Sequence, residues 1–162
     1  MAKIESVGVV GAGQMGNGIA QVAAMKGFAV VMTDISESAL EKGKATVAKS
    51  LDRLIKKEKI SEADKNAALE KIVTATEMSA LKNCDIVIEA ATENIDLKLK
   101  IFAELDKHVK ADALLCTNTS SISITKIAAA TSRPEKVAGM HFMNPVPLMK
   151  LVEGIQGLQT SD

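Results

Sequence analysis

Short apolar runs alternate along most of the chain with longer segments whose apolar residues recur at helical spacing. The short runs predict strands over residues 5–10, 28–33, 72–75, 85–91, 113–116, 136–142 and 148–152. The longer segments predict helices over residues 14–26, 97–109 and 122–130. Strands that alternate with helices in this way predict an α/β fold with a doubly wound, mainly parallel sheet.

A longer helical excursion separates the second predicted strand from the third. Ser36 has the character of a helix cap, and the charged run 56–59 is typical of a solvated helix end. Ser61 then predicts the cap of a second helix, with Asp64 three residues later as the acidic partner of a capping box. We expect these two helices to form a hairpin arm that projects from the sheet.

Length and composition are those of an ordinary soluble domain. The chain has 162 residues, of which 47% are hydrophobic and 25% charged, enough for one domain with a sizeable core. Twenty basic residues balance twenty acidic ones, and only 2% are aromatic, which argues against nucleic acid as a partner. No apolar run approaches the length of a membrane span, and no leader sequence is evident. We therefore expect a cytoplasmic protein without a membrane partner, although a cleaved targeting peptide would leave no trace.

The chain has two cysteines, Cys84 and Cys116, and neither belongs to a CxxC pair. Cys84 precedes one predicted strand, and Cys116 lies at the end of another. The spacing therefore favours buried free thiols in a reducing compartment over a metal site or a catalytic thiol. We predict no metal centre.

A glycine-rich turn follows the first predicted strand, in the run VGVVGAGQMG at residues 7–16. Gly11 permits a sharp turn, Gly13 lets the backbone approach a pyrophosphate, and Gly16 lets helix and strand pack closely. The helix that begins near Gln14 would point its free N–H groups at the phosphates. This strand–turn–helix unit predicts a Rossmann-like dinucleotide site, the alternative being an ordinary turn with chance glycines.

Asp34 closes the second predicted strand, where a Rossmann-like site holds the ribose 2′-hydroxyl group. A carboxylate there accepts a hydrogen bond from that hydroxyl and repels a 2′-phosphate, and no arginine stands beside it. The sequence therefore predicts NAD, rather than NADP, as the cofactor.

Polar side chains follow the apolar runs at Asp34 and in the segments 89–94, 117–121 and 141–144. In an open parallel sheet, ligands bind outside the carboxyl ends of the strands. We therefore expect these segments to line one edge of the sheet and to form the active site together.

His141 is the candidate catalytic base. It ends a predicted strand, whereas His108 lies at a helix end among lysines, where a solvated role suffices. An alcohol-oxidising enzyme needs a base for the hydroxyl proton, and imidazole titrates in the right range. Glu153, twelve residues later, is the candidate carboxylate that orients the ring. A purely structural histidine is the alternative, which the upstream nucleotide motif disfavours.

Two other candidate positions have both structural and functional interpretations. Ser120 can bind a substrate oxygen or cap the following helix, a role open equally to Ser121 and Ser123. Glu93 and Asn94 can begin a helix or contact the cofactor.

These residues together resemble a known family. The stretch HFMNPVPLMKLVE at residues 141–153 is highly specific, and it is joined by residues 7–18, 89–94 and 118–121. Each resembles the corresponding part of the L-3-hydroxyacyl-CoA dehydrogenases, most closely the bacterial 3-hydroxybutyryl-CoA dehydrogenases. The resemblance covers essentially the whole chain.

The resemblance implies an NAD-dependent oxidoreductase of fatty acid and butanoate metabolism that acts on acetoacetyl-CoA or 3-hydroxybutyryl-CoA. His141 matches the catalytic base, Glu153 the paired acid and Ser120 a serine that contacts substrate and cofactor. With the glycine turn included, the expected cofactor-binding residues are Gly11, Gly13, Gln14, Met15, Gly16, Asp34, Ala90, Glu93, Lys98, Ser120 and Asn144. The helical arm matches the one that contacts coenzyme A, with Ser50 and Lys57 as the expected contacts.

The family's chain continues with a helix, a strand and a mostly helical domain. That domain carries a substrate-site asparagine and the homodimer interface. The resemblance thus implies that residues 1–162 are a truncated NAD-binding domain that turns over poorly or not at all alone. Two alternatives are a 6-phosphogluconate-type or other β-hydroxyacid dehydrogenase, which takes its base from a later lysine, and an NAD-sensing module that does not need His141.

Overall fold

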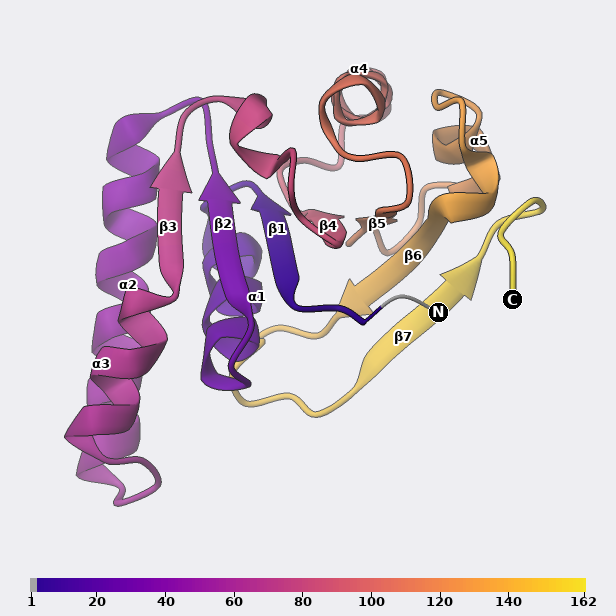
Figure 1. Cartoon of the computed structure of the whole chain (residues 1–162). Coiled ribbons are helices and arrows are strands. Elements are labelled where there is room, and N and C mark those ends of the chain that lie inside the picture. Colours follow the sequence, from indigo (N-terminus) through magenta and orange to yellow (C-terminus); the bar gives the residue numbers. More distant parts are fainter. Residues whose placement is uncertain (1–2) are drawn as a thin grey trace.

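The computed structural model describes residues 3–162, which form one seven-stranded sheet with helices on both faces (Figure 1). The strands are β1 (Ser6–Val10), β2 (Ala29–Thr33), β3 (Ile72–Ala75), β4 (Ile86–Glu89), β5 (Leu114–Thr117), β6 (Val137–Phe142) and β7 (Val152–Gln156). Their order in the sheet is β3-β2-β1-β4-β5-β6-β7, and all neighbours are parallel except β6 and β7. The predicted α/β, Rossmann-like architecture is confirmed.

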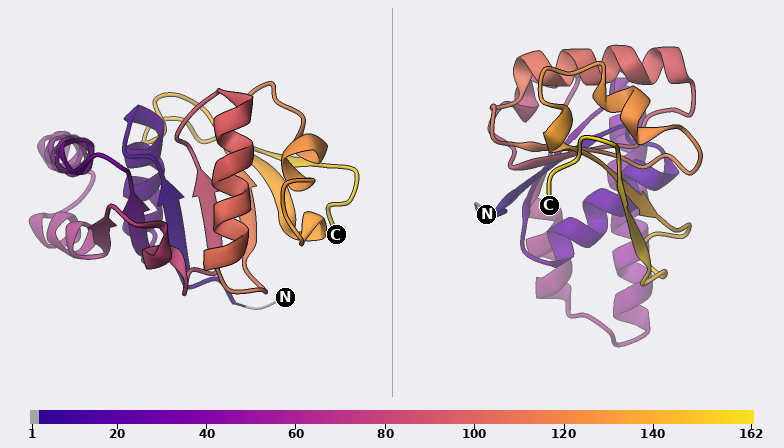
Figure 2. Two further views of the ribbon diagram at one scale, coloured as in Figure 1. Left: turned by 90° about the horizontal axis from the view of Figure 1, so that it is seen from above. Right: turned by 90° about the vertical axis from the view of Figure 1, so that its right-hand side faces the viewer.

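Helices cover the two faces of the sheet separately. The chain forms α1 (Gln14–Met25), α2 (Glu37–Lys56), α3 (Glu62–Glu70), α4 (Ile95–His108) and α5 (Ile124–Ala128), with short 3-10 turns η1 (Met78–Leu81) and η2 (Pro134–Lys136). Figure 2 shows α4 and α5 over one face and α1 and the arm under the other. Among the helices within residues 3–162, none is both long and apolar enough to cross a membrane.

Each face of the sheet has its own apolar core. Val9, Met32 and Ile88 pack towards α1 and α2, whereas Val87 and Leu115 pack towards α4 and α5. Successive strand residues point to opposite faces, so strands covered on both sides must be apolar throughout. This is why β1 and β4 are nearly continuous apolar runs.

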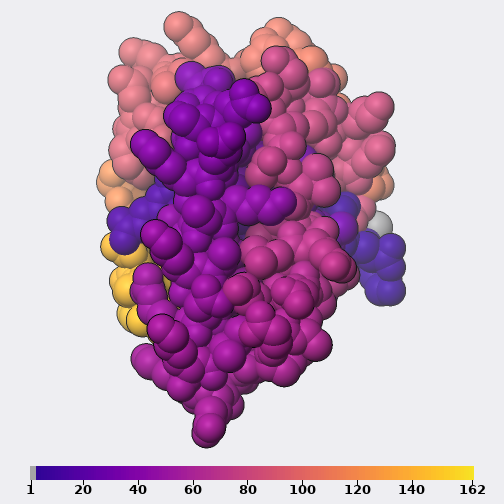
Figure 3. Space-filling view, turned by 90° about the vertical axis from the view of Figure 1, so that its left-hand side faces the viewer, coloured from indigo at the N-terminus to yellow at the C-terminus, as the bar shows by residue number. Residues whose placement is uncertain are grey.

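The arm consists of α2 and α3, and both predicted caps are present. The Ser36 hydroxyl accepts a hydrogen bond from the Ala39 amide (3.2 Å), and Ser61 and Asp64 form a reciprocal capping box. The two helices cover one end of the molecule (Figure 3) because α2 buries an apolar face, including Val47 and Leu51, against the core. The lower part of the hairpin, with α3, extends past the start of β3 (Figure 1).

The last predicted strand, over residues 148–152, is wrong, because β7 begins only at Val152. The amides of Leu148 and Met149 both donate to the Pro145 carbonyl (3.0 and 3.1 Å), which closes a turn where the strand was expected. The apolar residues in this stretch are exposed, with Leu148 at 67%, so their pattern reflects no contact with the core. Glu153 consequently lies near the start of its strand rather than at its end.

Candidate active site

The glycine-rich turn lies between β1 and α1, beside the β1–β4 junction where the strand order changes direction. Gly11 has a φ of +102°, in the left-handed region that favours glycine. A Cβ at Gly16 would lie 1.8 Å from the Gly11 carbonyl oxygen, so only glycine allows α1 to pack against the turn. The crevice at such a junction is where ligands bind in open α/β sheets.

The first turn of α1 has the features that a pyrophosphate requires. Gly13 occupies the cap position, and within residues 3–162 no side chain caps this helix. A Cβ built on Gly13 would meet no heavy atom within 4 Å, so the space above the turn is open. Free amides and the positive end of the helix dipole attract an anion into this space. Gln14 and Met15 begin the helix.

Asp34 lies directly beside the glycine turn. One carboxylate oxygen accepts from the Ala12 amide (2.9 Å) and the other from the Ser36 amide (3.0 Å). A carboxylate offers about four acceptor positions, so capacity remains for a ribose hydroxyl. Asp34 therefore holds the turn to the start of the arm and can still bind a ligand.

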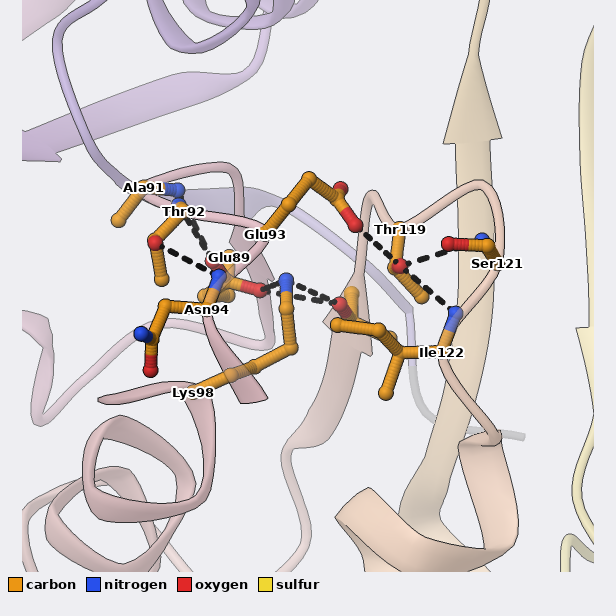
Figure 4. Close-up of polar contacts among 10 residues, drawn as sticks. Glu89, Ala91, Thr92, Glu93, Asn94, Lys98, Thr119, Ser121 and Ile122 are labelled. Atoms are coloured by element: carbon orange, nitrogen blue, oxygen red, sulfur yellow. Dashed lines mark hydrogen bonds and ion pairs between the residues drawn. The ribbon is translucent and has the colours of Figure 1, made fainter. Parts of the chain in front are cut away.

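A cleft of about 200 Å³ lies between the α1 start and the loops after β4 and β5. It is lined by Met15, Ala90, Ala91, Thr92, Glu93, Lys98 and Asn118. Four of the predicted cofactor-binding residues thus meet around one space. The side chain of Glu93 accepts a hydrogen bond from the Thr119 hydroxyl (2.8 Å), which joins the two loops (Figure 4).

Two of the open sequence interpretations are settled by the caps. Asn94 is the cap of α4, because its side chain accepts from the Leu97 amide (3.0 Å). Ser123 caps α5 through the Lys126 amide (3.3 Å). Ser120 is exposed and lines a separate cleft of about 310 Å³, which leaves its hydroxyl accessible.

His141 and Glu153 are direct partners across the antiparallel β6–β7 pair. The His141 Nδ1 atom lies 2.8 Å from Glu153 Oε2, and the His141 side chain is 22% exposed. A neutral ring held this way carries its hydrogen on Nδ1 and leaves Nε2 as a free acceptor. Asn118 supports the strand end, since its side-chain oxygen accepts from the Phe142 amide (2.8 Å).

A groove of about 350 Å³ separates the arm from the proline loop, residues 144–147. Its lining includes four predicted site residues, Gln14, Ser50, Lys57 and Asn144. The Gln14 amide nitrogen donates to the Asn144 side-chain oxygen (3.1 Å), which links the glycine turn to the segment after His141. Arg53 also lines the groove and adds a second cation to it.

Metal and thiol chemistry find no support at this site. Within residues 3–162, no cluster of three or more His, Cys, Asp or Glu side chains has the geometry of a metal site. Cys84 and Cys116 are both buried free thiols. Burial raises the pKa of Cys84 to about 11 and that of Cys116 to about 12, which disfavours the reactive thiolate.

Sequence reasoning missed Arg53, which lines the groove beside Ser50 and Lys57. Arg53 had a usable signal, because positions 50, 53 and 57 share one face of a helix. Glu89 and Thr117 fall in the polar segments expected at this edge of the sheet, but their contact with each other depends on the β4–β5 register and could not be predicted.

Comparison with known proteins agrees with the geometry. The family model described as "3-hydroxyacyl-CoA dehydrogenase, NAD binding domain" matches residues 6–162. A 3-hydroxybutyryl-CoA dehydrogenase from Bradyrhizobium diazoefficiens is 53% identical over 161 residues, covering 99% of this chain and 55% of that protein. The chain thus spans about half the length of that relative.

Solved structures give the same result. The crystal structure of (S)-3-hydroxybutyryl-CoA dehydrogenase from Ralstonia eutropha matches with a TM-score of 0.97 and 62% identity, over 99% of this chain and 56% of that one. A lactate dehydrogenase from Eimeria maxima, at 17% identity and a TM-score of 0.60 over 88% of this chain and 45% of that one, shares the fold alone. The chain therefore belongs to the 3-hydroxyacyl-CoA dehydrogenase family and corresponds to its NAD-binding domain.

Proposed function

We propose that this chain binds NAD at the glycine turn and supplies the proton-transferring pair of a 3-hydroxybutyryl-CoA dehydrogenase. The observation that carries the proposal is the contact of His141 Nδ1 with Glu153 Oε2 (2.8 Å) at the edge of the sheet that holds the dinucleotide motif. The open space at Gly13 and the spare acceptor capacity of Asp34 fit the pyrophosphate and ribose of NAD. When bound, NAD supplies the hydride acceptor.

His141 is suited to take the proton from the hydroxyl oxygen on the carbon that loses hydride. Its Nδ1–H donates to Glu153, so Nε2 presents a lone pair. The Glu153 carboxylate stabilises the imidazolium that forms and keeps the ring in the productive orientation. In the reverse direction, the protonated ring returns the proton to the ketone oxygen.

The groove between the arm and the proline loop is the proposed site for the coenzyme A part of the substrate. Ser50, Arg53 and Lys57 line it, and cationic side chains there favour phosphate groups. Asn144 lines the same groove and closely follows His141, so a ligand in the groove would extend towards the base.

We further propose that residues 1–162 alone turn over poorly. The chain spans 55–56% of the relatives compared above. Every residue of β7 is exposed, including Glu153 at 50% of its side chain, and Leu151 and Leu158 are 57% and 86% exposed. A pair this open to water lacks the desolvation and substrate positioning that speed proton and hydride transfer.

The test separates cofactor binding from catalysis. NADH is titrated by its own fluorescence, which is excited at a wavelength that protein side chains do not absorb. Turnover of acetoacetyl-CoA is measured on this chain and on a chimera in which the remaining part of the Ralstonia eutropha enzyme follows residue 162. We expect NADH binding in both proteins and rapid turnover only in the chimera.

The matched variant is His141→Gln, which keeps a polar side chain and removes the base. It should abolish turnover of the chimera and leave the NADH Kd within about twofold. Unchanged turnover would exclude His141 as the base, and a chain that binds NADH while its chimera stays inactive would indicate a nucleotide-sensing module. Family-typical turnover by residues 1–162 alone would refute the proposed need for the remaining part.

A further inference from the structure

Two carboxylates bracket β4 and accept the same kinds of hydrogen bond. Asp85, immediately before the strand, accepts from two backbone amides, one hydroxyl and one lysine. Glu89, the last residue of the strand, accepts from the amides of Ala91 and Thr92, the hydroxyl of Thr117 and the ammonium of Lys98. The two sites differ in location, since Glu89 lies at the carboxyl edge of the sheet and Asp85 at the opposite edge.

Figure 4 shows the polar contacts of Glu89, whose site is almost completely buried. The side chains of Glu89 and Lys98 are 0% and 1% exposed, and Thr117 is 0% exposed. The Thr117 hydroxyl donates to Glu89 (2.9 Å) and accepts from Lys98 Nζ (3.1 Å). Within residues 3–162, no buried side-chain N or O atom is left without a partner. A satisfied network of this kind is stiff and holds its members in one arrangement.

This network lies directly beneath the cleft between α1 and the β4 loop. Glu89 fixes the backbone at Ala91 (2.9 Å) and Thr92 (3.4 Å), and both residues line that cleft. Lys98 lines it too, and its ammonium has three hydrogens, of which Glu89 and Thr117 take two. One donor therefore remains for a ligand in the cleft.

We propose that Glu89 is a positioning residue for the dinucleotide, which holds both the Ala91–Thr92 backbone and the Lys98 ammonium in the arrangement that binds it. The proposal rests on the proposed NAD site and assigns a role to a residue that does not itself reach the ligand. Glu89 also neutralises Lys98, so the network offers the cofactor a directed hydrogen bond without a net positive charge.

Three roles for Glu89 predict different effects of Glu89→Gln on the Kd for NADH. Positioning predicts weaker binding, because the amide can no longer accept from every partner and the loop shifts. A purely electrostatic role predicts tighter binding, because a negative charge near an anionic ligand is removed. A purely structural role predicts a lower Tm with an unchanged Kd.

Asp85→Asn is the matched control, because it removes a carboxylate with the same donor set from the other end of the same strand. Both variants should lower Tm. We expect Glu89→Gln to raise the NADH Kd at least about tenfold, as for a lost charge-assisted hydrogen bond, and Asp85→Asn to leave it within about twofold.

Thr117→Val keeps the shape of the side chain and removes one hydrogen-bonding group from the network. It tests the positioning role of Glu89 if Glu89→Gln fails to fold. It should raise the NADH Kd about threefold. The positioning role is overturned if the folded Glu89→Gln variant binds NADH as tightly as the unsubstituted chain or more tightly. If only Thr117→Val folds, the same result in that variant overturns it. Failure of the unsubstituted chain to bind NADH would instead refute the proposed NAD site.

Discussion

The seating of the proline loop on α1 can be tested at Gly18. A Cβ at this position would lie 2.9 Å from the Cβ of Val146 and 3.2 Å from its Cγ2. Carbon atoms in contact normally stay about 3.5–4.0 Å apart, so Gly18→Ala forces the loop outward by roughly 0.5–1 Å. Val146 is only 4% exposed and belongs to the core beneath the loop, so this movement disturbs packing.

The magnitudes follow from the packing on both sides of the contact. Overpacking costs about 1–3 kcal/mol, and replacing glycine by alanine inside a helix returns up to about 1 kcal/mol, so we expect Gly18→Ala to lose about 1–2 kcal/mol. Val146→Ala removes two methyl groups and leaves a small cavity, which costs about 2–3 kcal/mol. Independent effects would sum to about 3–5 kcal/mol.

The double variant should not reach that sum. The new methyl group at position 18 fills part of the space that the Val146 methyl groups vacate, and the contact with Cγ2 (3.2 Å) is removed. Alanine keeps the Cβ that would lie 2.9 Å from the new methyl group, so part of the clash remains. We expect a loss of about 2–3 kcal/mol, which is a coupling of about 1–2 kcal/mol between the two positions. Urea denaturation followed by far-UV circular dichroism measures all four proteins, because the chain has no Trp or Tyr to report by fluorescence.

Two outcomes would refute this reasoning. If Gly18→Ala is as stable as the unsubstituted chain, the proline loop moves freely and is not seated on α1. If the two substitutions are additive within about 0.5 kcal/mol, the methyl groups do not share one space.

Three further predictions concern groups away from the candidate site. Asp85→Asn should lower stability by about 1–2 kcal/mol at neutral pH, a figure reduced by partial exposure. The hydrogen bond from Lys110, then those from residues 5 and 6, hold the pKa of Asp85 well below its ordinary value. The Asp85 carboxylate therefore contributes its full stabilisation above about pH 4, and this stabilisation is lost as the pH falls towards the folded-state pKa. Between pH 5 and pH 2, the Tm of the unsubstituted chain should fall more steeply than the Tm of Asp85→Asn. The Arg133 guanidinium donates to three carbonyl oxygens at the end of α4 (2.5, 2.7 and 3.1 Å) and to the Asp106 carboxylate (2.7 Å). Arg133→Ala should therefore lower the free energy of unfolding by about 3 kcal/mol in the same urea experiment. Arg133→Lys should recover little of this loss, because an ammonium cannot reach all four acceptors. Cys84 and Cys116 should not react with Ellman's reagent in the native protein and should both react in 6 M guanidinium, since burial raises the pKa of each thiol; rapid labelling of the native protein would contradict their burial.

Local patterns predicted the parts of the fold that depend on local chemistry. The glycine turn and the caps at Ser36 and Ser61 involve contacts between residues a few positions apart, so they can be predicted from the sequence. The start of β7 could not be predicted this way. It depends on the turn after Pro145, and the apolar residues of that turn resemble a strand although they pack against nothing in the core.

The contact between His141 and Glu153 was predicted correctly, although the predicted start of the strand that carries Glu153 was wrong. A histidine at a strand end suggested a base, and the twelve-residue spacing suggested a partner in the next strand. The register then places the two residues directly opposite each other, although the strand that carries Glu153 begins later than the pattern indicated. The contact between the two side chains depends on the register of β6 and β7, and the length of the turn between the two strands sets that register.

The sequence predicted that the site lies at the carboxyl end of the strands, but it could not predict which polar groups at each end have partners within the protein. At the end that carries Asp85 and Arg133, polar groups are engaged by other parts of the protein, from residues up to 80 positions away. At the other end, hydrogen-bonding capacity remains at Asp34, at the α1 amides beside the open space at Gly13, and at Lys98, which lines a cleft. A protein that only had to fold would gain by engaging both ends equally. Unused capacity on rigid, otherwise satisfied groups is what a ligand site requires, because binding then needs no rearrangement of the protein.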